Sequence, residues 1–516
     1  MLLGCETMRI CLVLFCCFAA GSAWAEDVNV LDCGAMPDGT TLATPAIQKA
    51  IDRCASAGGG TVTVPAGRFL TNTVFLKSNV NLHLGQGAVL LGGTDPRAFT
   101  QAVVYANGIE NASITGPGTI DGQGFKKNYP TNGPRHNDIR LFRSKKITVQ
   151  DITLVNSPSW VFRILECEAV SVRGVRIYSF ANENNDGIDI DGKNITISDC
   201  IIDCDDDAVC LKSDNPDYLV ENVAIANCVI ASNCNAIKFG TSSRCGFRNV
   251  SIGNCVIRRP SEAAQRHWAA TIPGVTRDDT VISGLALEVV DGGVMDQVTI
   301  TNISMTGVQT PLFIRLGSRN GPGSLRNVVI SNITATNESL ITSSITGIPG
   351  SYVENVTVRD VIFTYKGTGT LAQASAPVPE KEATYPENRM FGPSLPAYGL
   401  YARHVKNLIF ENFRLNLAAP DARPAVLLDD CHNIKLIDFD LAPPSNDQPL
   451  IRLIQSTNVT LSGYQSVTPV AKFMQVEGKA SSGIKLTGND LTGVRSAITL
   501  GQGCEESAVK EWNNLR

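Results

Sequence analysis

Three six-residue stretches decide the fold of this chain: ITISDC at Ile195–Cys200, VAIANC at Val223–Cys228 and VSIGNC at Val250–Cys255. Each stretch alternates apolar and polar residues, which is typical of a short β-strand, and then places Asn, Asp or Gly before a last apolar residue. The stretches begin 28 and then 27 residues apart. A strand pattern repeated at a nearly fixed spacing indicates a solenoid, in which each unit stacks on its neighbour.

The same pattern recurs along most of the chain. Further copies are Ile147–Ile152, Val170–Val175, Val298–Ile303, Val328–Ile333, Val356–Val361, Leu408–Phe413, Ile434–Phe439, Val459–Tyr464 and, more weakly, Ile484–Asn489. Most spacings are 23 to 30 residues, and we read the gaps of 48 and 52 residues, at 255–303 and 361–413, as two periods each. Strand alternation excludes helical repeats, the Leu/Asn ladder of a leucine-rich repeat is absent, and a propeller blade needs about 40 residues or more. The sequence therefore predicts an all-β chain that folds as a right-handed parallel β-helix.

The N-terminus is predicted to be a signal peptide that covers residues 1–25. Cys11–Ala20 is an apolar run that follows Arg9, and Ala23–Ala25 supplies a small-x-small cleavage site, so the mature chain should begin at Glu26. The run is too short to span a bilayer. We therefore expect a secreted or periplasmic protein with no membrane partner.

Residues 26–516 are expected to form a single parallel β-helix catalytic domain. Within it, residues 26–110 should form the N-terminal cap and the first coils. Thr44–Cys54 has helical periodicity, and a short capping helix there would cover the open end of the solenoid, where unpaired backbone is a pairing hazard. Residues 372–396 are rich in proline and contain no repeat, so we predict an inserted loop.

Composition excludes one class of partner. The net charge is -5, charged residues make up 18%, and no basic block is present, so nucleic acid is not expected to bind. No cysteine or histidine spacing matches a zinc site, and we predict no cofactor and no metal. We expect a monomer.

The cysteines follow the repeat. Cys200, Cys228 and Cys255 hold the same place in three consecutive copies, which predicts a stacked ladder of buried side chains. A free cysteine behaves as a small buried hydrophobe, so we favour reduced thiols over disulfides at these positions. Cys33 with Cys54 is the pair we expect if a bridge forms.

Acidic residues crowd one stretch of the chain. Its members are Asp186, Asp189, Asp191, Asp203, Asp205, Asp206 and Asp207. Asp186 and Asp206 are 20 residues apart, slightly less than one coil, so they should lie on adjacent coils of one face. Stacked carboxylates raise each other's pKa, and the two common uses of such a cluster are calcium binding and acid/base catalysis. Asp206 and Asp207 can both face a substrate only if the backbone turns there, because neighbouring strand residues point to opposite faces.

Three motifs in this region resemble glycoside hydrolase family 28, the polygalacturonase and rhamnogalacturonan hydrolase family. GPGTIDGQG at Gly116–Gly124 resembles the segment that precedes the family's active site. NNDGIDID at Asn184–Asp191 matches its Asn-x-Asp motif, and DDDAVCLKS at Asp205–Ser213 matches its paired-Asp motif. The resemblance covers nearly the whole chain after the signal peptide, and the two aspartate motifs one coil apart make it specific.

The resemblance implies roles for three aspartates. Asp206 would be the general acid that protonates the leaving glycosidic oxygen. Asp186 and Asp207 would hold and deprotonate the attacking water. It also implies an inverting mechanism, which needs roughly 6.5–9.5 Å between acid and base.

Two motifs of the family are missing. In CNAIKFGT, Cys234–Thr241, Asn235 stands where the family has a histidine. In GLALEV, which takes the place of the Arg-Ile-Lys motif by counting coils, Ala286 and Glu288 replace the two cations. We expect that subsite to repel an acidic sugar, with Lys238 or Arg315 able to hold a carboxylate elsewhere.

The departures argue against plain polygalacturonate and favour a related pectic polysaccharide or oligosaccharide, such as rhamnogalacturonan. The residues expected to bind it are Asn184, Asp189, Asn235, Lys238, Glu288 and Arg315. Two alternatives stay open at this point. One is a calcium-dependent pectic polysaccharide lyase on the same fold, and the other is a non-catalytic carbohydrate-binding solenoid.

Overall fold

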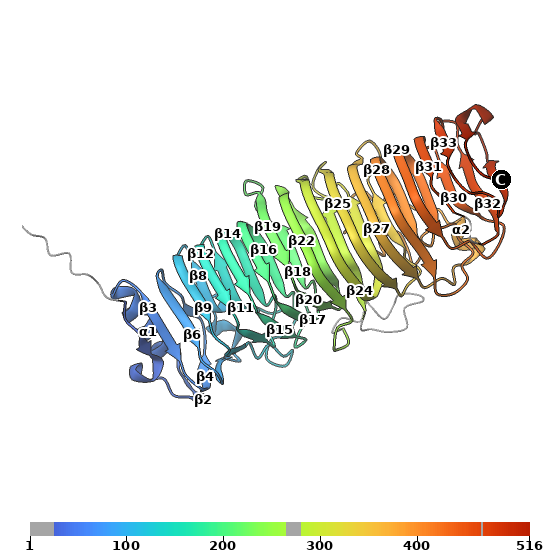
Figure 1. The fold of residues 1–516 in the computed structure, drawn as a ribbon. Coiled ribbons are helices and arrows are strands. Elements are labelled where there is room, and N and C mark those ends of the chain that lie inside the picture. Colours follow the sequence, from blue (N-terminus) through green and yellow to red (C-terminus); the bar gives the residue numbers. More distant parts are fainter. Residues whose placement is uncertain (1–24, 265–279, 466–467) are drawn as a thin grey trace, which may run out of the picture.

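The computed structural model describes residues 25–264, 280–465 and 468–516. These residues form an elongated tube of short strands that runs from the N-terminal to the C-terminal end (Figure 1). Every pairing between its named strands is parallel. The predicted all-β, right-handed parallel β-helix is therefore confirmed. The predicted signal peptide falls almost entirely on residues 1–24, outside the described residues.

Each coil contributes to three stacked sheets. The repeat sheet contains β1 (Val28–Asn29), β3 (Gly60–Val64), β6 (Val80–Leu84), β9 (Glu110–Thr115), β12 (Lys145–Gln150), β19 (Val220–Ala226), β31 (Thr457–Ser462), β33 (Ile484–Thr487) and β35 (Val509–Trp512). The middle sheet contains β2 (Asp38–Leu42), β4 (Gly67–Thr71), β7 (Ala88–Gly92), β10 (Thr119–Asp121), β13 (Thr153–Val155), β15 (Arg176–Ser179), β17 (Ile201–Cys204) and β20 (Val229–Ser232).

The third sheet, here called the site sheet, carries the acidic residues. It contains β5 (Val74–Phe75), β8 (Ala102–Asn107), β11 (Asn137–Phe142), β18 (Val209–Ser213), β21 (Asn235–Ser243), β23 (Val281–Val289), β26 (Ser343–Thr346), β30 (Pro449–Ile454), β32 (Val470–Glu477) and β34 (Val494–Leu500). Long strands bend from one sheet into the next, namely β14 (Phe162–Arg173), β16 (Ile188–Ser198), β22 (Gly246–Arg258), β24 (Val294–Leu316), β25 (Ser324–Asn337), β27 (Val353–Tyr365), β28 (Leu400–Leu417) and β29 (Val426–Leu441).

The six-residue copies stack in register in the repeat sheet. Ile195 pairs with Val223, Val223 with Val250, and Val250 with Val298. The Asn, Asp or Gly of each copy has a left-handed backbone, with φ of 58° at Asp199, 59° at Asn227 and 56° at Asn254. These residue types tolerate that conformation best, which explains why the repeat demands them.

The same left-handed residues form a ladder that we call the amide corner, between the repeat sheet and the middle sheet. The Nδ2 of Asn254 donates to Asn227 at 3.4 Å, and Asn302 donates to Asn254 at 3.0 Å. Asn332 then donates to Asn302 at 3.1 Å. Each coil therefore satisfies a polar group of its neighbour.

The expectation that each long gap hides two coils is wrong. Cys255 pairs directly with Ile303, and Val361 pairs directly with Phe413. Each gap is a single coil that contains a long insertion between the middle sheet and the site sheet. The repeat spacing alone could not distinguish an extra coil from an insertion, because both add about the same number of residues.

Apolar side chains fill the tube in one continuous core. Cys200, Cys228 and Cys255 are buried in it as predicted, and each thiol donates to a carbonyl two residues earlier at 3.2 Å. All cysteines among the described residues are free, so the expected Cys33–Cys54 bridge is wrong. Cys54 faces inward from its helix, and its thiol donates to the carbonyl of Glu26 at 3.0 Å.

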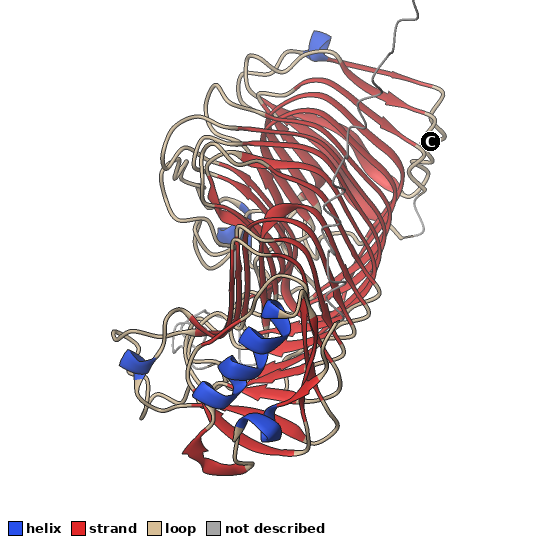
Figure 2. Ribbon diagram, turned by 90° about the vertical axis from the view of Figure 1, so that its left-hand side faces the viewer, coloured by secondary structure: helices blue, strands red, loops and turns tan. Residues whose placement is uncertain are grey.

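Helix α1 (Thr44–Ser56) lies across the N-terminal end of the tube, where Figure 2 shows it in front of the first strands. It buries Ile47, Ala50 and Ile51 against the first coil. The second helix, α2 (Leu371–Ala374), is a single turn. Within the described residues, neither helix has the length and apolar character that a membrane crossing requires.

The insertion between β27 and β28 covers residues 366–399, somewhat more than the predicted 372–396, and it contains α2. It folds back on the outward face of the site sheet. Met390, Phe391 and Leu395 pack there in a small second core against Phe313 and Tyr401. This segment therefore reaches the region that holds the acidic residues.

Candidate active site

The acidic residues lie where the chain turns from the middle sheet into the site sheet. We call this place the acidic corner. The backbone turns at residues 205–208, between β17 and β18, which allows Asp206 and Asp207 to share one side of the molecule. Because Ile188 pairs with Val209, Asp186 lies one coil before Asp207, as the sequence predicted. All three carboxyl groups are buried, with exposed fractions of 3–5%.

Asp207 is held as an anion. Its Oδ1 accepts a hydrogen bond from Asn235 Nδ2 at 2.7 Å, and its Oδ2 lies 3.1 Å from Lys238 Nζ. Burial acts to raise the pKa of Asp207, but the charges of Lys238 and Lys212 and the Asn235 amide hold it below the usual range. Asp207 is therefore ionised at any pH near neutrality.

The pKa of Asp186 is displaced in the opposite direction. Burial, followed by the charges of Asp206 and Asp189, raises the pKa of Asp186 well above its ordinary value. Lys212 opposes this effect from 3.4 Å but also lies 3.2 Å from Asp189, so its charge is shared between two carboxyl groups. Burial likewise raises the pKa of Asp189, to about 6. The pKa of Asp186 thus lies above that of Asp207, so Asp186 is the more readily protonated of the two, and its Oδ1 has no hydrogen-bond partner in the structure.

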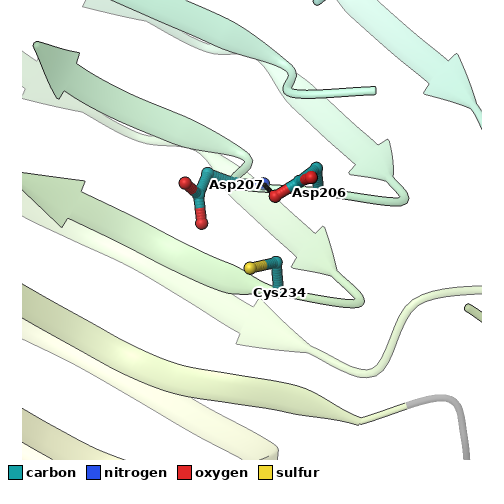
Figure 3. A group of neighbouring side chains, drawn as sticks. All are labelled: Asp206, Asp207 and Cys234. Carbon is teal, nitrogen blue, oxygen red and sulfur yellow. Dashed lines mark hydrogen bonds between the residues drawn. The ribbon is translucent and has the colours of Figure 1, made fainter. Parts of the chain in front are cut away.

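Asp206 faces the same space as Asp207. Asn184 Nδ2 donates to Asp206 Oδ2 at 3.4 Å, and Figure 3 shows Cys234 on the following coil beside the aspartate pair. One oxygen of Asp206, one of Asp207 and the Cys234 sulfur lie within 4.8 Å of one another. Two carboxyl groups and a thiol therefore meet at one point of the acidic corner.

The same group is where a metal could bind among the described residues. A thiol with two carboxylates does not suit calcium, which takes about six to eight oxygen ligands. Asn235 and Lys238 already contact Asp207. The expectation that no metal is needed stays a prediction.

Glu288 lies on β23, one coil after Lys238 of the acidic corner. Its side chain is fully buried, with Oε2 3.9 Å from Lys238 Nζ and within 3.4 Å of the Thr241 hydroxyl. Burial raises the pKa of Glu288 to about 8, although Lys238 opposes that effect. A buried and mostly neutral Glu288 does not confront a substrate, so it gives no reason for the site to repel an acidic sugar.

The structure places other candidates away from the acids. Arg315 is fully buried, and its guanidinium donates to the carbonyls of Gly347, Glu380 and Lys381 at 2.8–3.1 Å. Its guanidinium therefore holds the insertion in place. By contrast, Asn184, Asp189, Asn235 and Lys238 all contact the acidic corner, as described above.

Sequence reasoning missed four contributors. Lys212 lies two residues after Cys210, the residue that pairs with Asp189, and its Nζ reaches the Asp189 carboxylate at 3.2 Å. The ring of Trp160 lies 4.9 Å from Lys212 Nζ, and Arg135 donates to Asn184 Oδ1 at 3.1 Å. Tyr385, far along the chain, contacts Lys238 at 3.4 Å, and no local pattern could have indicated that contact.

Comparison with known proteins agrees with this geometry. Residues 54–232, which include all three aspartates, match the family described as Glycosyl hydrolases family 28. Over these residues the chain is similar to the family 28 glycosyl hydrolases. Asn235, Lys238, Glu288 and the insertion lie beyond the part that matches the family.

Two curated relatives and one solved structure define the similarity. The chain is 31% identical over 231 residues to "Probable polygalacturonase" of Vitis vinifera, covering 39% of this chain and 47% of that protein. It is 30% identical over 229 residues to "Probable rhamnogalacturonase B" of Neosartorya fischeri, covering 44% and 43%. The matches thus span less than half of those relatives.

The solved structure is a hyperthermoactive exopolygalacturonase from Thermotoga maritima. It has a TM-score of 0.60 and 22% identity, and the similarity covers 76% of this chain and 92% of that one. At this identity the likeness concerns the fold alone, and it is consistent with the family 28 solenoid.

Proposed function

We propose that this protein is a glycoside hydrolase that cleaves a glycosidic bond in a pectic polysaccharide or oligosaccharide, galacturonic-acid-containing or rhamnogalacturonan-like. We also propose that residues 26–516 form one catalytic unit, secreted or periplasmic. The names of the relatives, polygalacturonase and rhamnogalacturonase, support this substrate class. The match of residues 54–232 to a glycosyl hydrolase family supports the reaction.

One observation carries the proposal: two stacked carboxyl groups have pKa values displaced in opposite directions. The pKa of Asp186 is raised and the pKa of Asp207 is lowered. Diverging pKa values let one carboxyl group of the cluster stay ionised as a proton acceptor while its neighbour keeps a proton and donates a hydrogen bond at the same pH. A solenoid that only binds carbohydrate has no need of such a separation.

The chemistry follows from the placement of the three aspartates. The ionised Asp207 accepts a proton from the attacking water. At the same time the oxygen of that water bonds to the anomeric carbon. Asp206 gives its proton to the leaving oxygen as the glycosidic bond breaks. Asp186 stays neutral, and its free Oδ1 can hydrogen-bond the water or a sugar hydroxyl. Solvent then returns a proton to Asp206 and removes one from Asp207.

Inversion at the anomeric carbon remains a prediction from the family resemblance. The close approach of Asp206 and Asp207 makes the stereochemistry worth measuring. NMR of the first products should show an anomeric configuration opposite to that of the cleaved bond. A product that keeps the configuration would instead identify a carboxylate nucleophile.

The test is a product screen of the purified protein on polygalacturonate, rhamnogalacturonan and pectic oligosaccharides. We expect new reducing ends without absorbance from unsaturated uronides, and activity that survives chelation of divalent cations. Unsaturated products together with loss of activity on chelation would support the calcium-dependent lyase instead. Hydrolysis of polygalacturonate alone would contradict a rhamnogalacturonan-like substrate.

Asp206→Asn should lower turnover by about 10²–10⁴-fold, because a positioned general acid contributes that much. The matched control is Asp360→Asn, an equally small change at a left-handed position of the amide corner. We expect that control to keep full activity. A protein whose sugar binding and biological effect survive Asp206→Asn unchanged would be a non-catalytic carbohydrate-binding solenoid.

A further inference from the structure

The outward face of the site sheet changes character along the tube. Its residues stack in register as Asp189, Cys210, Lys238, Ala286, Phe313, Ser344, Tyr401 and Leu427. The first three belong to the acidic corner, and most of the others are apolar. A sugar chain that lies along this face meets the change between Lys238 and Ala286.

The insertion covers the apolar part of that face. Ala286, Phe313 and Tyr401 are fully buried, with exposed fractions of 0–1%, in a cluster completed by Phe391 and Leu395 of the insertion. On the described residues, a substrate therefore cannot continue along this face past Lys238 toward the C-terminal end.

Buried polar contacts hold the insertion in this position. Arg403 donates to the carbonyls of Val378 and Pro379 at 2.7 Å, in addition to the contacts of Arg315. Asn388 Nδ2 donates to the Ile282 carbonyl at 2.9 Å and to the Thr310 hydroxyl at 3.0 Å. Lifting the insertion would leave these buried donors without partners, which costs free energy. The insertion, called the wall from here on, is therefore a fixed part of the fold.

A pocket of about 180 Å³ remains between the acids and this wall. Its lining combines the acidic corner with the insertion: Asp206, Cys234, Asn235, Lys238, Ile282, Tyr385, Pro386, Glu387 and Arg389. Pockets for drug-sized ligands measure about 300–1,000 Å³, so this one suits a single sugar residue better than a run of them.

We propose that this pocket receives the terminal pyranose of the substrate, so that the enzyme cleaves pectic chains from one end. The inference deepens the proposed function and rests on it. The ring of Tyr385 is 53% exposed and lies beside the pocket, where it can stack on the apolar face of a sugar. Asn235, Glu387 and Arg389 supply polar groups for its hydroxyl or carboxyl substituents.

The mode of cleavage is tested on the wild-type enzyme with whichever polymer it hydrolyses. Viscosity and reducing ends are followed together, and products are sized from the first minutes. We expect viscosity to fall slowly relative to bonds broken, and one small product to accumulate from the start. A steep early fall in viscosity with a ladder of intermediate oligomers would overturn chain-end cleavage while leaving the hydrolase assignment intact. Failure to break any bond would overturn both.

The pocket itself is tested with Tyr385→Ala on oligosaccharides labelled at one end. We expect KM to rise about 10-fold with a smaller change in kcat, because the ring contacts the terminal residue but not the reacting atoms. Leu371→Ala is the control, since Leu371 is an equally exposed side chain (55%) of the same insertion and does not line the pocket. Equal KM values for the two variants would contradict the assignment of the pocket.

Discussion

The two corners of the coil stack their side chains in different ways. At the amide corner the ladder is uncharged, and Asn254 both donates to Asn227 and accepts from Asn302. At the acidic corner carboxyl groups face one another, and two buried lysines, Lys212 and Lys238, are needed to hold them. The first corner repeats along the tube, whereas the second occupies only a few coils.

This difference shows where the chain departs from its own repeat. A neutral ladder satisfies its polar groups without unbalanced charge, so it can be extended coil by coil. Buried carboxylates need counter-charges, and burial with like charges displaces their pKa values. The acidic corner is therefore the place where structure is arranged for chemistry rather than for stability.

The comparison is tested most severely within the acidic corner. Asp207→Asn should lower kcat by about 10²–10⁴-fold, because it removes the ionised group that accepts a proton. Asp186→Asn should cost only about 10-fold, because the amide mimics the neutral acid that a raised pKa implies. Initial rates at saturating substrate measure both. Equal losses would mean that Asp186 acts as an anion.

Removing a counter-charge should shift the pH profile. Lys238→Met takes away the ammonium 3.1 Å from Asp207, so the pKa of Asp207 rises. Activity requires that group ionised, and its acidic limb should move to higher pH by about 1–3 pH units. The control is Lys193→Met, which breaks a partly exposed pair with Glu221. An unshifted profile would show that Lys238 does not act through Asp207.

The acidic corner should also make stability depend on pH. Glu288 keeps its proton up to about pH 8 in the folded state but loses it near 4.5 when unfolded. The folded state thus binds more protons between these values, and stability falls as pH rises through that window. Glu288→Gln should therefore stabilise the protein at pH 8 relative to pH 5, by about 3.5 kcal/mol. Urea unfolding at both values measures it, and an equal effect at the two pH values would refute it.

The amide corner should respond to backbone conformation alone. Asn254→Ala keeps a Cβ but removes the short polar side chain that makes φ of 56° tolerable, and it should cost about 1–2 kcal/mol of unfolding free energy. Asn254→Gly keeps the conformation and removes the ladder contact, so it should cost less. Both costs should be the same at pH 5 and pH 8, and activity should not change. If the loss of unfolding free energy depended strongly on pH, the amide corner would not differ from the acidic corner in this respect.

Much of the fold can be predicted from the sequence because the left-handed position of each repeat copy requires Asn, Asp or Gly. Asp199, Asn227 and Asn254 record the corner, and alternation in the flanking residues records the strand. The length of a gap between repeat copies does not show how many coils the gap contains. Whether 48 residues make two coils or one coil with an insertion depends on pairing between Cys255 and Ile303, which is a contact across coils.

The site divides in the same way. Asp186, Asp206 and Asp207 could be found because they recur one coil apart. The replacements at Ala286 and Glu288 could be located by counting coils, but their burial could not, because the insertion that covers Ala286 folds back from residues 390–397. Tyr385 reaches Lys238 across 147 residues of sequence, a distance over which no local pattern gives information.

The fixed attachment of the insertion has a consequence for biosynthesis. The three aspartates are synthesised well before Tyr385, and the wall can dock only after β28, which carries Arg403, has been made. A nascent or truncated chain that ends before β28 therefore presents the acidic corner without the wall. Synthesis of the chain through β28 is thus what closes one end of the acidic corner.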